Sequence, residues 1–248
     1  MKMKNKKQEQ ELKKKQHKAQ LKQKKNKEAI LDRTNDTRNE KLKILITCEG
    51  KNTEKDYFNQ LRIASMQVEV IGIGDNTISL VKKTINIRDS KKIKYDEVWC
   101  VFDADPKPDN PKQLQNFNEA IWLAEKNNIN VAYSHQAFEY WLLLHFNDYQ
   151  GEPMDRKLYK QKLNEFLKPY NLKYDSSNDK RGKSISSEMF DILMAKVNGK
   201  RRVCHAIERA EKISKTFSDN NPAKNESSTK VFLLMKKLLG IDEENTCK

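Results

Sequence analysis

Three acidic residues follow apolar segments of the sequence at positions where strands would end. Glu49 comes directly after residues 43–48, and Asp103 and Asp105 come directly after residues 95–102. If both segments are parallel strands of one sheet, these residues lie at its carboxyl edge, where open α/β sheets bind ligands. Three carboxylates held together favour a divalent cation, and hard oxygen ligands suit Mg²⁺ or Mn²⁺ better than Zn²⁺. The sequence therefore predicts a Mg²⁺ or Mn²⁺ site formed by Glu49, Asp103 and Asp105.

The chemistry that such a site supports is phosphoryl transfer. A bound cation polarises a phosphodiester, and Glu49 either completes the metal shell or accepts a proton from the attacking water. Lys51, near the start of a predicted helix, is placed to contact the substrate and to neutralise charge that develops on its phosphate. The alternatives are a solvated turn for the Asp-x-Asp pair and an ordinary surface lysine for Lys51. The presence of acids at two strand ends favours the metal site.

Two further candidates lie in the otherwise apolar segment of residues 137–146. A carboxylate on a helix that is apolar all round is unfavourable unless it is paired. Glu139 is therefore either a structural partner of a buried donor or a catalytic residue that positions a second metal or the substrate. His145 lies about 120° away around the helix. It is either a buried histidine with satisfied ring nitrogens or a substrate-binding residue, and we retain it as a substrate-binding candidate.

Apolar segments and helical patterns alternate four times in the first half of the chain. β-branched and continuous apolar runs predict strands, and recurrence at three and four residues predicts helices between them. Asn52 or Thr53 is expected to cap the first helix, and Asp75 or Asn76 the second. Parallel strands need such crossover helices, so the pattern predicts a doubly wound, Rossmann-like α/β core of about four parallel strands. The expected strands are residues 43–48, 68–71, 95–102 and 129–133.

Charge and composition divide the chain into three parts. Residues 1–43 hold 16 Lys/Arg and 6 Asp/Glu, whereas the rest holds 33 and 29, so most of the net charge of +14 belongs to the N-terminal segment. We expect residues 1–42 to be a basic low-complexity tail, either simply solvated or an arm that binds nucleic acid through phosphates. The α/β core is expected over residues 43–150. Residues 151–248 are expected to be a helical extension, with helices at 158–167, 185–197, 203–213 and 229–239.

Several classes of protein are excluded by motif and composition. No apolar run approaches the roughly 18 residues of a membrane span, and the N-terminus lacks the apolar core of a secretory signal. Four cysteines without zinc-ligand spacing indicate neither a disulfide scaffold nor a zinc site. The chain also has no P-loop. A cytoplasmic protein without a membrane contact is expected.

Four segments of the chain resemble the RloB-like proteins. The first is Ile44-Leu-Ile-Thr-Cys-Glu49-Gly50-Lys51-x-Thr-Glu54-x-x-Tyr-Phe58, the second Val101-Phe-Asp-Ala-Asp105, the third Phe138-Glu-x-Trp-Leu-Leu-Leu-His-Phe146, and the fourth Asn221-Pro222 with the helix after Lys230. The resemblance implies a Toprim-like catalytic fold that holds Mg²⁺ through Glu49, Asp103 and Asp105. It also implies a role in abortive-infection phage defence beside an ATPase partner of the ABC or AAA type (RloA-like).

Two hypotheses follow. The first is a Mg²⁺- or Mn²⁺-dependent nuclease that cleaves DNA or RNA and is regulated by the ATPase. The second is a non-enzymatic Toprim-like scaffold or sensor that docks on the ATPase or binds nucleic acid through the basic arm. The choice between DNA and RNA, and whether the chain forms a homo-oligomer, stay open at this stage.

Overall fold

The computed structural model describes residues 18, 41–107, 109–110, 112–175, 183–217, 221–242, 245 and 247. The expected basic tail therefore lies almost wholly outside the described residues. The chain divides into two compact units, Met1–Lys41 and Leu42–Lys248. All the elements discussed below belong to the second unit.

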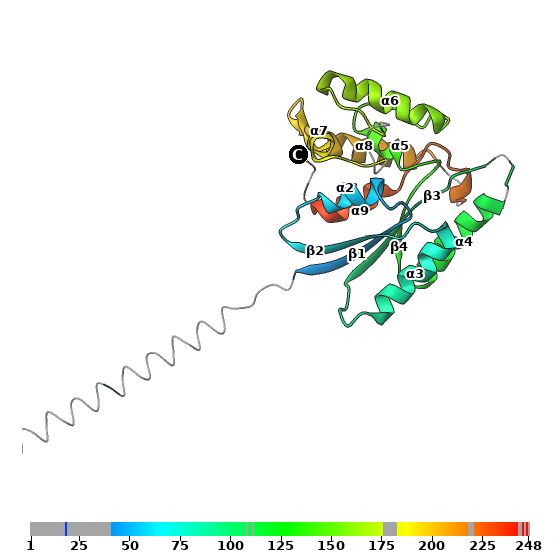
Figure 1. Cartoon of the computed structure of the whole chain (residues 1–248), viewed down its shortest axis with the longest axis vertical. Coiled ribbons are helices and arrows are strands. Elements are labelled where there is room, and N and C mark those ends of the chain that lie inside the picture. The colour runs from blue at the N-terminus through cyan, green and yellow to red at the C-terminus, as the bar shows by residue number, and fades with distance from the viewer. Residues whose placement is uncertain are drawn as a thin grey trace, which may run out of the picture. The chain divides into compact units, whose positions relative to one another are not determined.

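A four-stranded parallel sheet forms the centre of this unit (Figure 1). Its strands occur in the order β2-β1-β3-β4. Their bounds are β1 Leu42–Cys48, β2 Met66–Gly72, β3 Glu97–Asp103 and β4 Asn130–Ser134. The predicted α/β core with four parallel strands is thus confirmed, and β1 and β3 are direct neighbours.

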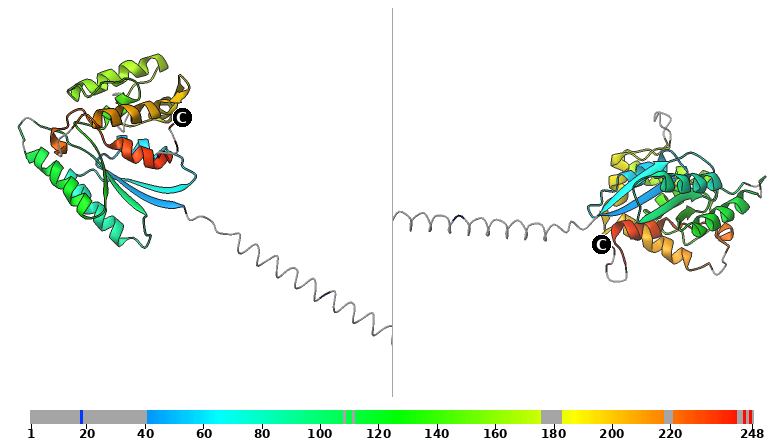
Figure 2. Two further views of the ribbon diagram at one scale, coloured as in Figure 1. Left: turned by 180° about the vertical axis from the view of Figure 1, so that it is seen from behind. Right: turned by 90° about the horizontal axis from the view of Figure 1, so that it is seen from below.

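Helices cover both faces of the sheet, because alternate residues of the central strands point to opposite sides. Leu45 packs with the helices α3 (Thr77–Ser90) and α4 (Lys112–Lys126) on one face. Ile44 and Ile46 pack on the other face, which α2 (Thr53–Asn59) and α9 (Val231–Leu239) cover. Views from behind and from below show the same layers (Figure 2). Continuous apolar strands are therefore explained by burial on both sides.

The remaining helices stack beyond α2 and α9 (Figure 1). They share the core cluster of that face. The C-terminal part is mainly helical, as expected, and α9 ends at Gly240 with a φ of 63°. The bounds of these helices are α5 Glu139–Leu144, α6 Lys157–Leu167, α7 Ser187–Met194 and α8 Arg202–Ser214.

The helix expected over residues 185–197 ends early. It is replaced after Met194 by a short hairpin of β5 (Lys196–Val197) and β6 (Lys200–Arg201). Asn198 and Gly199 form its turn, with φ values of 53° and 80°. An Asn-Gly pair favours this left-handed two-residue turn, so the hairpin replaces the last helical turn for a local reason.

Two further observations concern the whole unit. Among the described residues, none of the helices has the length and apolarity that crossing a membrane requires.

Cys204 of α8 forms a disulfide with Cys247, and the Cα atoms of the two residues are 5.4 Å apart. The cysteine spacing did not predict this bond, because 43 residues separate its partners. Cys48 and Cys100 are buried and free, as expected for small apolar residues within strands.

Candidate active site

The carboxyl ends of β1 and β3 bring two of the predicted acids together. Cys48 of β1 lies opposite Val101 of β3, and the backbone N–H of Glu49 continues the ladder by donating to the Val101 carbonyl at 2.9 Å. The side chain of Glu49 then turns back toward β3, where its Oε2 accepts the backbone N–H of Asp103 at 3.2 Å. Glu49 and Asp103 are therefore neighbours, as the sequence predicted.

Close backbone packing shapes the loop that follows β1. The N–H of Gly74 donates to the carbonyl of Glu49 at 2.9 Å. A Cβ atom on Gly72 would lie 2.8 Å from the carbonyl oxygen of Gly50, and one on Gly74 would collide with the side chain of Lys51. Gly74 also has a φ of 77°, which only glycine adopts at little cost. The glycines at and just after the end of β2 thus make room for the loop that carries Glu49 and Lys51.

A cavity of about 210 Å³ opens beside this loop. Residues from β3, α2, α5 and the segments before α6 and α7 form its wall. We call it the acidic cavity, because three carboxylates line it together with three basic side chains. The acids are Glu54, Asp103 and Glu139, and the basic residues are Lys51, Arg156 and Lys183.

The pKa values of three carboxylates in this region are raised, mainly by burial. Burial, followed by the charges of Glu54, Glu139 and Glu49, raises the pKa of Asp103 well above its usual range. Burial raises the pKa of Glu54 to about 7, and the charges of Glu139 and Glu49 add to the shift. The pKa of Glu49 is also raised by burial. Burial is the largest cause of each rise, and a cation bound among these carboxylates would favour their charged forms.

Glu54 owes its position to a close contact with Gly50. Its side chain is only 6 % exposed, and a Cβ atom on Gly50 would collide with its carboxylate. The carboxylate also accepts the backbone N–H of Gly50, which opposes the rise of its pKa. The absence of a side chain at residue 50 therefore lets this acid reach the cavity.

Glu139 is buried and paired. Its Oε1 accepts the hydroxyl of Tyr174 at 2.9 Å and the ammonium of Lys183 at 2.7 Å. This matches the expectation that an acid on an apolar helix needs a partner. Glu139 also lines the cavity, so its pairing orients Lys183 beside the other acids.

Asp105 takes a different direction from Asp103. Its carboxylate pairs with the guanidinium of Arg156 and lies 3.4 Å from the ammonium of Lys107. The backbone of Asp105 is left-handed, with a φ of 41°, and the residue is not part of the cavity wall. The predicted trio of Glu49, Asp103 and Asp105 is therefore brought together only in part.

The described residues have the ligand chemistry that a divalent cation needs, but they are not arranged around a single ion. The donors are carboxylate oxygens, which Mg²⁺ and Mn²⁺ prefer. In the part of the chain that the structure describes, however, no three acidic, histidine or cysteine side chains are arranged to hold an ion. Release of Asp105 from Arg156 is the change that would supply another carboxylate.

His145 does not line the acidic cavity; it lines a separate cavity at the end of α5. It is 2 % exposed at the end of α5. One ring nitrogen is 3.2 Å from the hydroxyl of Tyr57, and the other is 3.0 Å from the carbonyl of Trp141. Burial lowers its pKa to about 3, so the ring is neutral. These contacts fit the alternative of a satisfied buried histidine, and its role in substrate binding stays a prediction.

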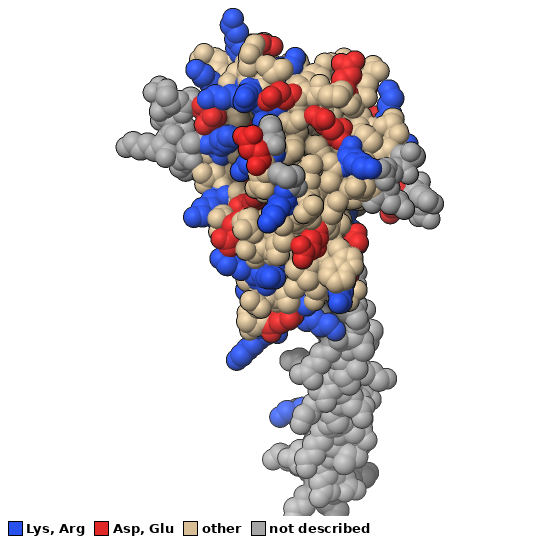
Figure 3. All heavy atoms as spheres, turned by 90° about the vertical axis from the view of Figure 1, so that its right-hand side faces the viewer, with Lys and Arg blue, Asp and Glu red and all other residues tan. Residues whose placement is uncertain are grey.

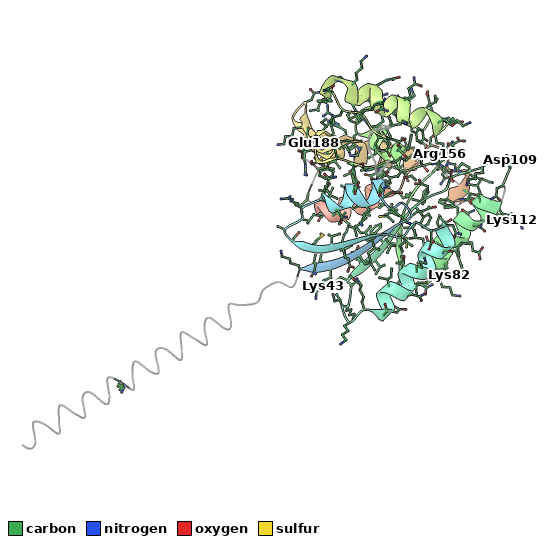
Figure 4. The ribbon with its side chains drawn as sticks, viewed as in Figure 1. Lys43, Lys82, Asp109, Lys112, Arg156 and Glu188 are labelled. Atoms are coloured by element: carbon green, nitrogen blue, oxygen red, sulfur yellow. A yellow bond between two sulfur atoms is a disulfide. The ribbon has the colours of Figure 1, made fainter. Side chains whose placement is uncertain are left out.

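Three charged residues of the cavity were not predicted as site residues. Glu54 lies in the first turn of α2. The sequence offered one indication of its role, since it is an acid that comes five residues after Glu49 and four after Gly50. Arg156 and Lys183 come from segments far along the chain. Figure 4 shows Arg156 between the end of β3 and the upper helices. No local pattern marks these two basic residues, since only the tertiary fold brings them to the sheet.

Comparison with protein families gave one result. The family model described as RloB-like protein matches residues 44–238. Comparisons with curated proteins and with solved structures gave no match. The matched segment spans the sheet, the acidic cavity and all of the helices from α2 to α8, with most of α9. The chain therefore belongs to the RloB-like protein family.

Proposed function

We propose that this chain hydrolyses phosphodiester bonds of DNA or RNA with Mg²⁺ or Mn²⁺ as cofactor. The observation that supports the proposal is the acidic cavity, where Asp103 at the end of β3 lies among three basic side chains and Glu49 at the end of β1 accepts the backbone N–H of Asp103. Carboxylates suit a hard cation, and basic groups suit the phosphate whose charge increases during the reaction. Open parallel sheets bind their ligands at this edge.

The proposed roles follow from position. Glu49 and Asp103 would hold the cation, joined by Asp105 once it leaves Arg156. The bound cation would supply Lewis-acid polarisation of the phosphate. Glu54 accepts the proton of the attacking water, because a carboxylate with a pKa of about 7 exchanges protons near neutral pH.

The basic residues of the cavity bind the substrate. Arg156 and Lys183 line the cavity together with Lys51, and each donates charge-assisted hydrogen bonds to phosphate oxygens. On the face seen in Figure 3, basic and acidic side chains of the described residues are intermixed, without a large field of one sign. Attraction of a polyanion to that part of the body is therefore weak, and the cavity itself is the proposed phosphate contact.

Family resemblance supports the wider role. We propose that the cleavage serves bacterial defence against phage, and that an ATPase of the ABC or AAA type regulates it. The ion pair of Arg156 with Asp105 is a contact on which such regulation could act, since it separates Asp105 from Asp103.

The test is cleavage of plasmid DNA and of total RNA in Mg²⁺ or Mn²⁺, with and without the ATPase. Asp103→Asn is expected to abolish cleavage. Asp109→Asn is the matched control, because Asp109 is an exposed acid on the loop after the same strand (Figure 4). No cleavage by the unmodified chain under any of these conditions would overturn the proposal and favour the scaffold hypothesis. Full activity of Asp103→Asn would refute the site.

A further inference from the structure

A second cavity lies at the other end of α5. It has a volume of about 420 Å³, within the range of small-molecule sites, whereas the acidic cavity is smaller. The end of α5, the end of α6, the hairpin and α8 enclose it. We call it the aromatic-basic pocket and define it by six of its residues: Phe146, Phe166, Tyr170, Arg202, His205 and Arg209. The buried His145 and the acidic Glu165 also line it.

Flat aromatic rings form one side of the pocket. The rings of Phe146 and Phe166 are stacked, with centroids 5.1 Å apart and planes at 5°. Tyr170 is 44 % exposed, so part of its ring is accessible to a ligand. These rings offer planar surfaces on which another planar group can stack.

Basic side chains line the pocket beside these rings. Arg202, His205 and Arg209 are spaced by three and four residues, so they share one face of α8. Arg202 is the first residue of α8, where the helix dipole is positive. An anion would therefore meet two guanidinium groups and a helix start on the same side.

The guanidinium of Arg202 is held in place before any ligand arrives. It donates to the Ile192 carbonyl at 3.0 Å and to the Tyr170 hydroxyl at 2.8 Å. It also lies 5.3 Å from the ring centre of Phe146. Arg209 donates to the Leu144 carbonyl at 2.7 Å. Fixed donors lose little entropy on binding, which favours a specific site over a general basic surface.

We infer that the aromatic-basic pocket binds a nucleoside phosphate, either a free nucleotide or one unit of a single-stranded nucleic acid. The base stacks on Tyr170 and on the guanidinium plane of Arg202, as unpaired bases do on aromatic and arginine side chains. The phosphate binds Arg202, Arg209 and His205 through charge-assisted hydrogen bonds. The pocket does not depend on the proposed function, because binding requires no cleavage.

The test measures binding to the full chain by fluorescence. The probes are N-methylanthraniloyl-labelled ATP and GTP for the free nucleotide, and a fluorescein-labelled single-stranded oligonucleotide for the polymer. Arg202→Ala is expected to weaken binding of at least one probe tenfold or more, and Tyr170→Ala about tenfold. Tyr170→Phe should keep most of the affinity because it keeps the ring. Circular dichroism and thermal melting check that each variant is folded.

Two controls separate this pocket from other basic surfaces and from the acidic cavity. Lys212→Ala removes a positive charge from an exposed position of the same helix and should leave affinity within twofold. For the two nucleotide probes, Asp103→Asn should weaken binding less than Arg202→Ala does, whatever happens to cleavage. Absence of binding by every probe would overturn the inference. So would equal losses in Arg202→Ala and Lys212→Ala, or a loss in Asp103→Asn that Arg202→Ala does not share.

Discussion

The carboxylate of Glu54 occupies the space that a side chain at Gly50 would fill. Gly50 has no left-handed backbone angle, so its small size and not its flexibility is what the fold uses. Gly50→Ala is expected to displace Glu54 and to lower the free energy of unfolding by about 1–3 kcal/mol. Urea denaturation measures this effect.

A double-mutant cycle identifies the partner of this contact. In a Glu54→Ala background, the added methyl group of Gly50→Ala has nothing to displace, and its cost should largely disappear. An undiminished cost in that background would show that the methyl group collides with another part of the loop.

The raised pKa of Glu54 predicts how stability depends on pH. Its folded-state pKa of about 7 exceeds the ordinary value of 4.5, so between these values the folded state binds more protons than the unfolded state. Stability therefore falls as pH rises through this window, by about 3 kcal/mol at most. Glu54→Gln should remove this decrease. Urea midpoints at pH 5 and pH 7.5 in EDTA measure it, and parallel curves for both proteins would contradict it.

His145 produces the opposite dependence on pH. Its folded-state pKa of about 3 is below the ordinary value of 6.5, so the unfolded state binds more protons as pH falls below 6.5. The chain should lose about 2 kcal/mol between pH 6.5 and pH 5 for this reason. His145→Gln should lack this loss and retain cleavage within twofold at pH 7.5. A strong loss of cleavage in a folded His145→Gln variant would support its predicted role in substrate binding.

Arg156 is expected to matter for cleavage far more than for stability. It is the guanidinium of the acidic cavity, and removal of a group that stabilises charge in a transition state costs about 10²–10³ in rate. Its ion pair with Asp105 is partly exposed and contributes about 1 kcal/mol or less to folding. Single-turnover cleavage by Arg156→Ala should fall accordingly, whereas Lys157→Ala, at the exposed neighbouring position, should not change.

The disulfide of Cys204 with Cys247 ties the C-terminal segment to α8. Cys247→Ser is expected to lower the free energy of unfolding by about 2–4 kcal/mol. Thermal melting with and without dithiothreitol tests this expectation. The reductant should lower the melting temperature of the unmodified chain toward that of the variant, and it should leave the variant unchanged. A reductant effect of equal size in both proteins would refute the bond as its cause.

The fold was predictable where local patterns carry the information. Continuous apolar runs such as residues 98–102 indicate strands buried on both faces. An acid directly after such a run must lie at the carboxyl edge of the sheet. Glu49 and Asp103 were placed correctly for this reason. Asp105 was not, because its direction depends on a left-handed turn and on a guanidinium 51 residues away.

The rest of the site depends on tertiary contacts that no spacing encodes. Lys183 reaches Glu139 across 44 residues of sequence. The partners of His145 include Tyr57, 88 residues earlier. The hairpin at Asn198 and Gly199 is a different case, because two adjacent residues encode its turn. The apolar residues before this pair have helical spacing, which led to the prediction of a longer helix.

Helix α5 has consequences for how the two cavities affect each other. It carries Glu139 at its first residue, and its last residue, Leu144, accepts the hydrogen bond from Arg209 of the aromatic-basic pocket. All six residues of α5 are buried, and the helix is about 9 Å long. A ligand that displaces one end therefore displaces a tightly packed unit. If nucleotide alters cation affinity by this route, linkage requires the cation to alter nucleotide affinity by the same factor.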